Sequence, residues 1–310
     1  MNRKKWGVGE GILLCAGWGF CGAVLQVCYG EVPWKSMAWP VSSYVLLGYG
    51  VCLGVGYAIL RHTSWISFLT SCRVAVPALL GVWLMTLLMG LFSQVPDGWA
   101  AREAGFLHRI AHSWPFAGLY VWLSILLAGV VLHRGEQLWQ RRSISVSDAS
   151  FCCFHLGLWL VLVAGALGYA DEVRLRLPLR AGVIQHKALD DQGKLYELPF
   201  GVQQDTLLWE ADVRSESPLP AFVGVELCLH PLRGEVQRES VRVNHPAQLA
   251  GWILYVIGYE SDVVTSEKTG VLEAVRNPWL PGMQVGIGCL MAGAMGWLVQ
   301  SPQRKKEGLV

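Results

Sequence analysis

Histidine is the residue that could do chemistry inside the apolar stretches of this chain. His155 lies within residues 149–170, a run that contains no Asp, Glu, Lys or Arg. A neutral imidazole offers one lone pair and one N–H there, which suits axial ligation of a haem iron. The alternative is a histidine hydrogen-bonded to a carbonyl or hydroxyl between helices, and spacing alone does not decide between the two. A haem at this place would pack on Phe151 and Trp159, while Gly157 would leave room for a flat macrocycle or a partner helix.

Two further histidines, His108 and His112, are four residues apart ahead of an apolar run. They share one face if a helix begins before them, and an i,i+4 pair can bind a metal ion, so His112 is a second candidate metal ligand. The alternative is a pair of interfacial side chains, because this spacing supplies no third ligand. The sequence has no C-x-x-C-H, no glycine-rich phosphate loop and no G-x-S-x-G, so it predicts neither a catalytic residue nor covalently attached haem.

Six stretches of the chain are free of Asp, Glu, Lys and Arg. They are residues 11–30, 36–60, 74–96, 110–133, 149–170 and 277–303. A helix of about 20 apolar residues crosses the ~30 Å hydrocarbon core and satisfies its own backbone there. With 53% hydrophobic residues, 15% charged residues and 15 Trp, the composition also indicates a membrane protein. We therefore predict six transmembrane helices.

The charges exclude two classes of function. Proton relays and transport of charged substrates need ionisable groups at depth, and these stretches hold none apart from histidine. The net charge of +2 gives no basic field for binding nucleic acid.

Lysine and arginine are unevenly distributed over the connecting segments. With the N-terminus inside, the inner segments hold eleven Lys and Arg, and the two short outer loops hold three. Because positive residues concentrate on the cytoplasmic side, we expect both termini in the cytoplasm and residues 171–276 outside. A helix that enters near Ala149 then places His155 about 9 Å in from the cytoplasmic side. The first stretch is longer than a signal core and no small-x-small site follows it, which favours a retained helix.

The outer segment, residues 171–276, differs in composition from the rest of the chain. It holds 11 basic and 16 acidic residues, a net charge of −5, and short β-rich runs separated by Gly and Pro. This pattern predicts an antiparallel β domain of about 100 residues, large enough for its own core. Cys228 is its only cysteine, which excludes a disulfide within it. We expect four parts: two N-terminal helices (1–63), three core helices (64–170), the β domain (171–276), and a last helix with a cytoplasmic tail (277–310).

Short motifs occur in a fixed order between about residues 64 and 300. They are Ser67-Phe68-Leu69, His112-Ser113-Trp114-Pro115-Phe116, His155-Leu156-Gly157, Leu198-Pro199-Phe200, Val243-Asn244-His245-Pro246 followed by Gly251-Trp252 and Tyr255, and Arg276-Asn277-Pro278-Trp279 with Pro281. In this order they resemble the ResB (CcsB) family, the membrane proteins of the system II pathway of cytochrome c maturation. The chain departs from that family in its two extra N-terminal helices, in Asn277 for the usual Asp and in Trp279 for the usual Gly. It lacks the tryptophan-rich segment of the partner family, ResC (CcsA).

The resemblance implies that His155 is an axial ligand of a b-type haem, held transiently and shared with a ResC (CcsA) partner chain. It implies a bacterial inner-membrane protein with a periplasmic β domain. Such a protein helps to carry haem across the membrane and presents it, together with apocytochrome c bearing C-x-x-C-H, for thioether attachment. On this interpretation the chain is a subunit of a cytochrome c haem lyase complex and not an enzyme alone.

Two other functions stay open. A b-type electron-transfer subunit would need paired histidines at two depths, and only His155 lies well inside an apolar stretch. A non-catalytic membrane scaffold, whose β domain binds a periplasmic protein, would show no dependence on haem.

Overall fold

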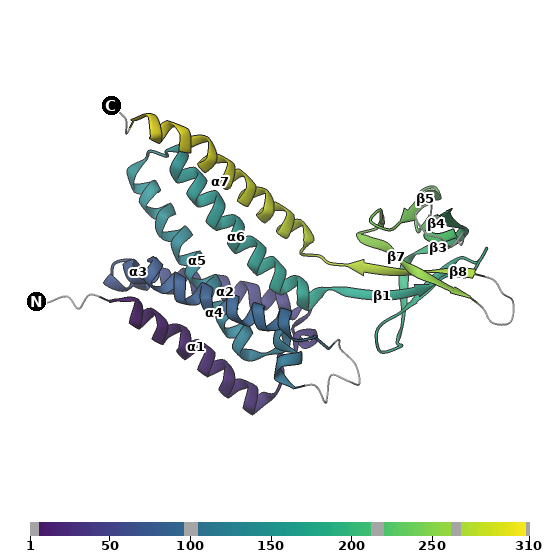
Figure 1. The fold of residues 1–310 in the computed structure, drawn as a ribbon, viewed down its shortest axis with the longest axis horizontal. Coiled ribbons are helices and arrows are strands. Elements are labelled where there is room, and N and C mark those ends of the chain that lie inside the picture. Colours follow the sequence, from purple (N-terminus) through teal and green to yellow (C-terminus); the bar gives the residue numbers. More distant parts are fainter. Residues whose placement is uncertain (1–5, 96–104, 212–219, 262–267, 308–310) are drawn as a thin grey trace, which may run out of the picture. The chain divides into compact units, whose positions relative to one another are not determined.

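The computed structural model describes residues 6–95, 105–211, 220–261 and 268–307. The chain divides into a helical unit, Met1–Asp171 with Trp279–Val310, and a β unit, Glu172–Pro278 (Figure 1). The helical unit contains α1 (Val8–Tyr29), η1 (Trp34–Met37), α2 (Val41–Leu60), α3 (Ser64–Leu69), α4 (Cys72–Leu91), η3 (Phe106–His108), η4 (Ile110–His112), α5 (Trp114–Arg141), α6 (Val146–Asp171) and α7 (Leu280–Glu307).

Within the described residues, six helices are long and apolar enough to cross a membrane: α1, α2, α4, α5, α6 and the part of α7 up to Gln300. This confirms the six stretches found in the sequence. None of the residues in the most apolar window of α2 is buried, and large side chains such as Leu47 and Ile59 are each 68% exposed. A water-soluble protein does not expose apolar surface on this scale. The chain is therefore a multi-pass membrane protein whose apolar helix faces contact lipid.

Small residues bring α6 and α7 into close contact (Figure 1). Ser150, Gly157 and Ala164 recur every seven residues on α6 and are buried. A Cβ added at Gly157 would lie 2.6 Å from the carbonyl oxygen of Gly286 in α7, and one added at Gly293 would lie 2.6 Å from the backbone nitrogen of Phe154. Because no side chain separates the two backbones, the helices interlock through van der Waals contact, which drives helix association in membranes.

The remaining helices surround α5. Helix α1 contacts α4 and α5, and Trp18 of α1 stacks on Trp122 of α5 with ring centroids 5.5 Å apart. A buried cluster joins Phe68 of α3 and Val74 of α4 to Leu126 of α5. Helix α5 begins where Ser113 accepts a hydrogen bond from the N–H of Phe116, as an N-cap residue does.

Asp171, the last residue of α6, joins three segments of the helical unit. Its carboxylate accepts hydrogen bonds from the N–H of Trp39 at 2.6 Å and the hydroxyl of Ser42 at 2.8 Å. It also accepts one from the indole N–H of Trp279, just before α7. All three partners donate, and Asp171 is 9% exposed, so the site requires a group that only accepts.

We expect Asp171→Asn to lower the free energy of unfolding by about 2 kcal/mol, because the amide NH₂ would face donors that the carboxylate now satisfies. Thermal unfolding of the purified full-length chain in detergent measures this loss. Ser42→Ala, which removes one donor and leaves the acceptor intact, should cost less. Equal stability of Asp171→Asn and the unchanged chain would show that the carboxylate does not tie these segments together.

In the described residues of the β unit, eight strands form one antiparallel sheet in the order β5-β4-β3-β2-β1-β8-β7-β6. The strands are β1 (Val173–Pro178), β2 (Gln185–Leu189), β3 (Leu195–Ala211), β4 (Pro220–Pro231), β5 (Gln237–Arg242), β6 (Ala247–Leu249), β7 (Trp252–Ser261) and β8 (Lys268–Arg276). The sheet curls so that β5 approaches β6 and β7. The antiparallel β domain predicted from the sequence is confirmed.

Alternation along the strands builds the core of the β unit. In β1, Leu175 and Leu177 are buried whereas Arg176 between them bonds Glu260 on the exposed side. The single thiol of the unit, Cys228 in β4, is buried and lies 3.3 Å from Oδ2 of Asp205. Burial raises the pKa of this thiol, and the carboxylate adds to the effect, so Cys228 stays protonated near neutral pH.

Candidate functional site

Helix α6 positions His155, and a capping box fixes its first turn. The hydroxyl of Ser145 accepts from the N–H of Asp148 at 3.1 Å, and the carboxylate of Asp148 accepts from the N–H of Ser145 at 3.4 Å. The helix therefore begins at Val146, before the expected entry near Ala149. His155 consequently lies about 13 Å along the axis rather than about 9 Å.

The imidazole of His155 is held in one orientation by its own helix. Its Nδ1 lies 2.9 Å from the carbonyl oxygen of Phe151, one turn earlier. A carbonyl only accepts, so Nδ1 carries the proton and the neutral ring keeps its lone pair on Nε2. Within the described part of the chain, no hydrogen-bond partner of Nε2 is found. Metal-ligating histidines are commonly oriented by such a bond from the second ring nitrogen to a carbonyl, so the geometry is compatible with ligation through Nε2.

Aromatic rings surround the half-buried imidazole on its own helix. The ring of Phe151 stacks on it at a centroid distance of 4.0 Å and an interplanar angle of 29°. Phe154 meets it edge-on, with the centroids 5.8 Å apart. These contacts restrict rotation of the ring, so the direction of the Nε2 lone pair is set before any ligand arrives.

Arg134 of α5 is a neighbour that sequence reasoning missed. Its guanidinium carbon lies 5.8 Å from the ring centroid of Phe151, and the same guanidinium pairs with Asp148 and bonds Gln137. Its Nε is buried and has no hydrogen-bond acceptor among the described residues. A buried N–H without an acceptor costs free energy, and it marks a place where an anionic group would be favoured. The available signal was a pair of opposite charges, Arg134 and Asp148, at the adjoining ends of two consecutive spans.

The other residues predicted to pack on haem lie on two faces of α6. Trp159, one turn beyond His155, packs against the buried cluster that includes Trp122 and Leu126 of α5. Its indole N–H, like that of Trp122, is buried without an acceptor within the described residues. Gly157 lies on the opposite face, where the backbone of α7 fills the space beside it. The structure therefore brings together Phe151, His155 and Trp159 on the α5 side, and it places Gly157 in the helix contact.

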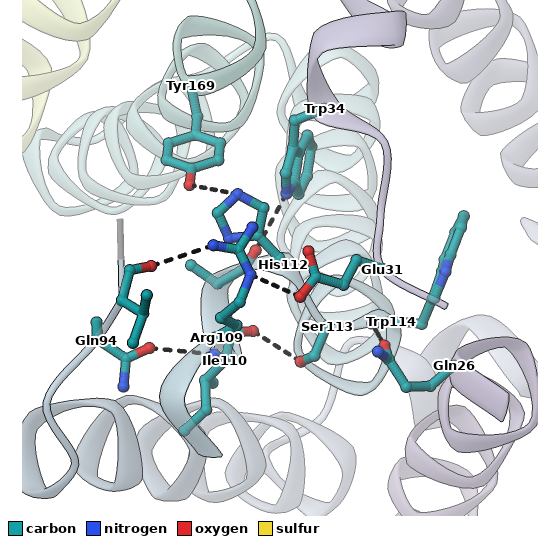
Figure 2. A network of polar contacts seen from close by, with 12 residues as sticks. Gln26, Glu31, Trp34, Gln94, Arg109, Ile110, His112, Ser113, Trp114 and Tyr169 are labelled. Carbon is teal, nitrogen blue, oxygen red and sulfur yellow. Dashed lines mark hydrogen bonds and ion pairs between the residues drawn. The ribbon is translucent and has the colours of Figure 1, made fainter. Parts of the chain in front are cut away.

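His108 and His112 do not form an i,i+4 pair. The helix begins only at Trp114, and the histidines belong to separate short 3₁₀ turns. Nδ1 of His108 donates to the carbonyl of Ser93 at 2.9 Å, whereas Nε2 of His112 lies 3.2 Å from the hydroxyl of Tyr169 (Figure 2). Among the described residues, no group of three or more His, Cys, Asp and Glu side chains could hold a metal ion. His112 therefore forms a hydrogen bond that joins η4 to α6.

Arg109 is the centre of the same network, which sequence reasoning also missed (Figure 2). Its side chain is 5% exposed, and Nε donates to Glu31 at 2.6 Å while a terminal nitrogen donates to the carbonyl of Val95 at 3.1 Å. The amide oxygen of Gln94 accepts from the N–H of Ile110 at 3.1 Å. These bonds connect the segments after α1 and α4 to the start of α5. Glu31 and Arg109 are far apart in the sequence, so their ion pair could not be predicted from a local pattern.

No family model matches the chain, and a search of curated proteins returned no match. A solved structure titled "Cytochrome c Heme Lyase CcmF" is similar over 94% of this chain and 45% of that one, at 14% sequence identity and a TM-score of 0.38. This chain thus spans less than half the length of that protein. Because the likeness is this low, the function of the chain is inferred from its own residues.

Proposed function

We propose that this chain is a membrane protein of cytochrome c maturation and that it binds haem through His155. The observation that carries the proposal is the state of this imidazole: Nδ1 is tied to the Phe151 carbonyl, the ring is stacked, and Nε2 has no partner within the described residues. A histidine that joins two helices by hydrogen bonds would contact a second helix, whereas the contacts found for His155 among the described residues are to Phe151 and Phe154 of its own helix. The ordered motifs that resemble the ResB (CcsB) family support the same function.

The residues around His155 suit haem as a cargo. Nε2 supplies one axial ligand for the iron, and the ring of Phe151 keeps the imidazole in place. The guanidinium of Arg134, which is partly exposed and paired with Asp148, provides a further N–H donor for a carboxylate of the cargo. No second histidine contacts His155 in the described residues, so the other axial ligand comes from a ResC (CcsA) partner chain. When bound, haem supplies the vinyl groups to which the thiols of apocytochrome c add.

On the proposed topology, His155 lies near the cytoplasmic side of the membrane. The excess of Lys and Arg on the inner segments places Arg134 and Asp148 there. The β unit then lies in the periplasm, where apocytochrome c is found. The net charge of −5 over residues 171–276 favours a basic partner, with a modest effect that salt screens.

Deletion of the gene, followed by haem staining of c-type cytochromes in membrane and soluble fractions, tests this function. We expect the stain to disappear while the apocytochromes persist, and to return with the full-length chain. The full-length chain purified from complemented cells should show a Soret band. Normal cytochrome c after deletion would contradict the proposal. A reversible haem spectrum with normal maturation would instead indicate electron transfer, and a haem-free chain that still supports a periplasmic partner would indicate a scaffold.

A further inference from the structure

An apolar cavity of about 110 Å³ separates α2 from α5, with α3 at one end. Its walls include Leu53, Gly56 and Leu60 of α2 and Ile125, Gly129 and Leu132 of α5. Apolar cavities of roughly this size, about 150 Å³ in an engineered case, stay dry and take up apolar molecules. The apolar walls offer a water molecule few hydrogen-bond partners, so an apolar occupant is favoured.

The glycines at this cavity behave differently from those between α6 and α7. A Cβ added at Gly56 would meet nothing within 4 Å, and one added at Gly129 would meet only Cγ2 of Thr70 at 4.0 Å. A Cβ at Gly157 would instead lie 2.6 Å from the backbone of α7. Small residues usually let two helices approach, but here the space that the glycines leave is not used by the chain itself.

Polar contacts lie beyond the two ends of the cavity. The hydroxyls of Tyr49 in α2 and Ser124 in α5 are 2.6 Å apart at one end. At the other end the hydroxyl of Tyr57 donates to Glu136, and Arg61 pairs with the same carboxylate at 3.5 Å. Tyr49 and Tyr57 are eight residues apart, which corresponds to about 12 Å along the helix. This apolar cavity, called the slot below, thus has a charged group near one end.

The charged end is open to the surroundings. The side chain of Arg61 is 45% exposed, and its one ion pair, to Glu136, is long. A guanidinium binds phosphate oxygens in a bidentate manner, and a partly exposed one at the end of a span lies where lipid headgroups lie. The same face of α2 has no buried residue in its apolar window, so lipid chains reach the slot from the side.

We propose that the slot between α2 and α5 binds a segment of one acyl chain of an anionic phospholipid, whose phosphate contacts Arg61. The apolar walls accommodate the chain, and Arg61 selects the charge of the headgroup. A bound lipid would fill the contact between α2 and α5 that the glycines leave open, and would thereby hold α2 against the rest of the helical unit.

Lipid analysis by mass spectrometry of the purified, haem-free full-length chain tests the proposal. After extensive detergent washing we expect the unchanged chain to retain a phospholipid and Gly56→Leu, which fills the slot, to lose it. Gly54→Leu is the matched control, because Gly54 is exposed on the same helix and also has nothing within 4 Å. Arg61→Gln should keep a lipid but lose the preference for anionic over zwitterionic headgroups.

Photo-crosslinking to the unchanged chain keeps the test decisive if Gly56→Leu fails to fold. A phosphatidylglycerol with a diazirine on its acyl chain should label the peptides of α2 and α5 that border the slot more strongly than it labels peptides of α7. Even labelling of all helices would overturn the proposal, as would equal lipid retention by Gly56→Leu and Gly54→Leu. Recovery of an isoprenoid quinone in place of the phospholipid would also overturn the proposal. So would a dimer of the chain that dissociates in Gly56→Leu, because a second copy would then occupy the slot. None of these outcomes depends on haem.

Discussion

Replacement of His155 by alanine is expected to weaken haem binding to the purified chain by at least about tenfold, since even groups that merely orient a metal ligand contribute this much. The substitution removes the lone pair on Nε2 and leaves α6 intact, because the hydrogen bond from Nδ1 to Phe151 is local to one turn. Titration of the full-length chain in detergent with haemin, followed by the Soret absorbance, measures the change. Added imidazole should restore part of the band by entering the space that the side chain vacates.

His112→Ala is the matched control for this experiment. Its imidazole lies against Tyr169 at the other end of α6, so its removal should leave the haem affinity unchanged. Phe151→Leu keeps the carbonyl that fixes Nδ1 and removes the stacked ring, and we expect it to shift the spectrum without abolishing binding. A normal Soret band in His155→Ala, or an equal loss in His112→Ala, would exclude His155 as the ligand.

The helices and the β unit follow from local features of the sequence. Charged side chains are costly in hydrocarbon, so the gaps between them give the number of spans, and alternation in segments such as β1 gives the strands. Local chemistry also explains the shifted start of α6, since Ser145 and Asp148, three residues apart, form a capping box. By contrast, the break between His108 and His112 depends on contacts with Ser93 and Tyr169, which belong to other segments.

The surroundings of His155 could be predicted only in part. Phe151 lies one turn away on the same helix, so its contact with the imidazole follows from the spacing. The approach of Arg134 and the burial of Trp159 depend on how α5 and α6 pack, and a sequence pattern does not give that rotation. The pairing of Gly157 with α7 joins residues about 130 positions apart, which no local rule could supply. Family membership in ResB (CcsB) stays a prediction, because short ordered motifs support it and no family model matches.

The structure places a partner helix, α7, beside Gly157, which is one of the two roles expected for it, and the substitution Gly157→Ala separates this role from a contact with haem. Its new Cβ would lie 2.6 Å from the carbonyl oxygen of Gly286 and 2.6 Å from the nitrogen of Leu290. Both atoms are backbone, so relief requires α6 and α7 to separate. We expect the free energy of unfolding to fall by about 3 kcal/mol, the cost of severe overpacking. Thermal unfolding in detergent measures this loss.

Gly165→Ala is the control, because the nearest atom to its new Cβ is the hydroxyl of Tyr120 at 3.7 Å, an ordinary contact. This variant should unfold at nearly the same temperature as the unchanged chain. The haem affinity of the folded fraction of Gly157→Ala should also be unchanged, since Gly157 and His155 lie on opposite faces of α6. If Gly157→Ala were stable and bound haem weakly, Gly157 would belong to the haem site, and the contact between α6 and α7 would have to open when haem binds.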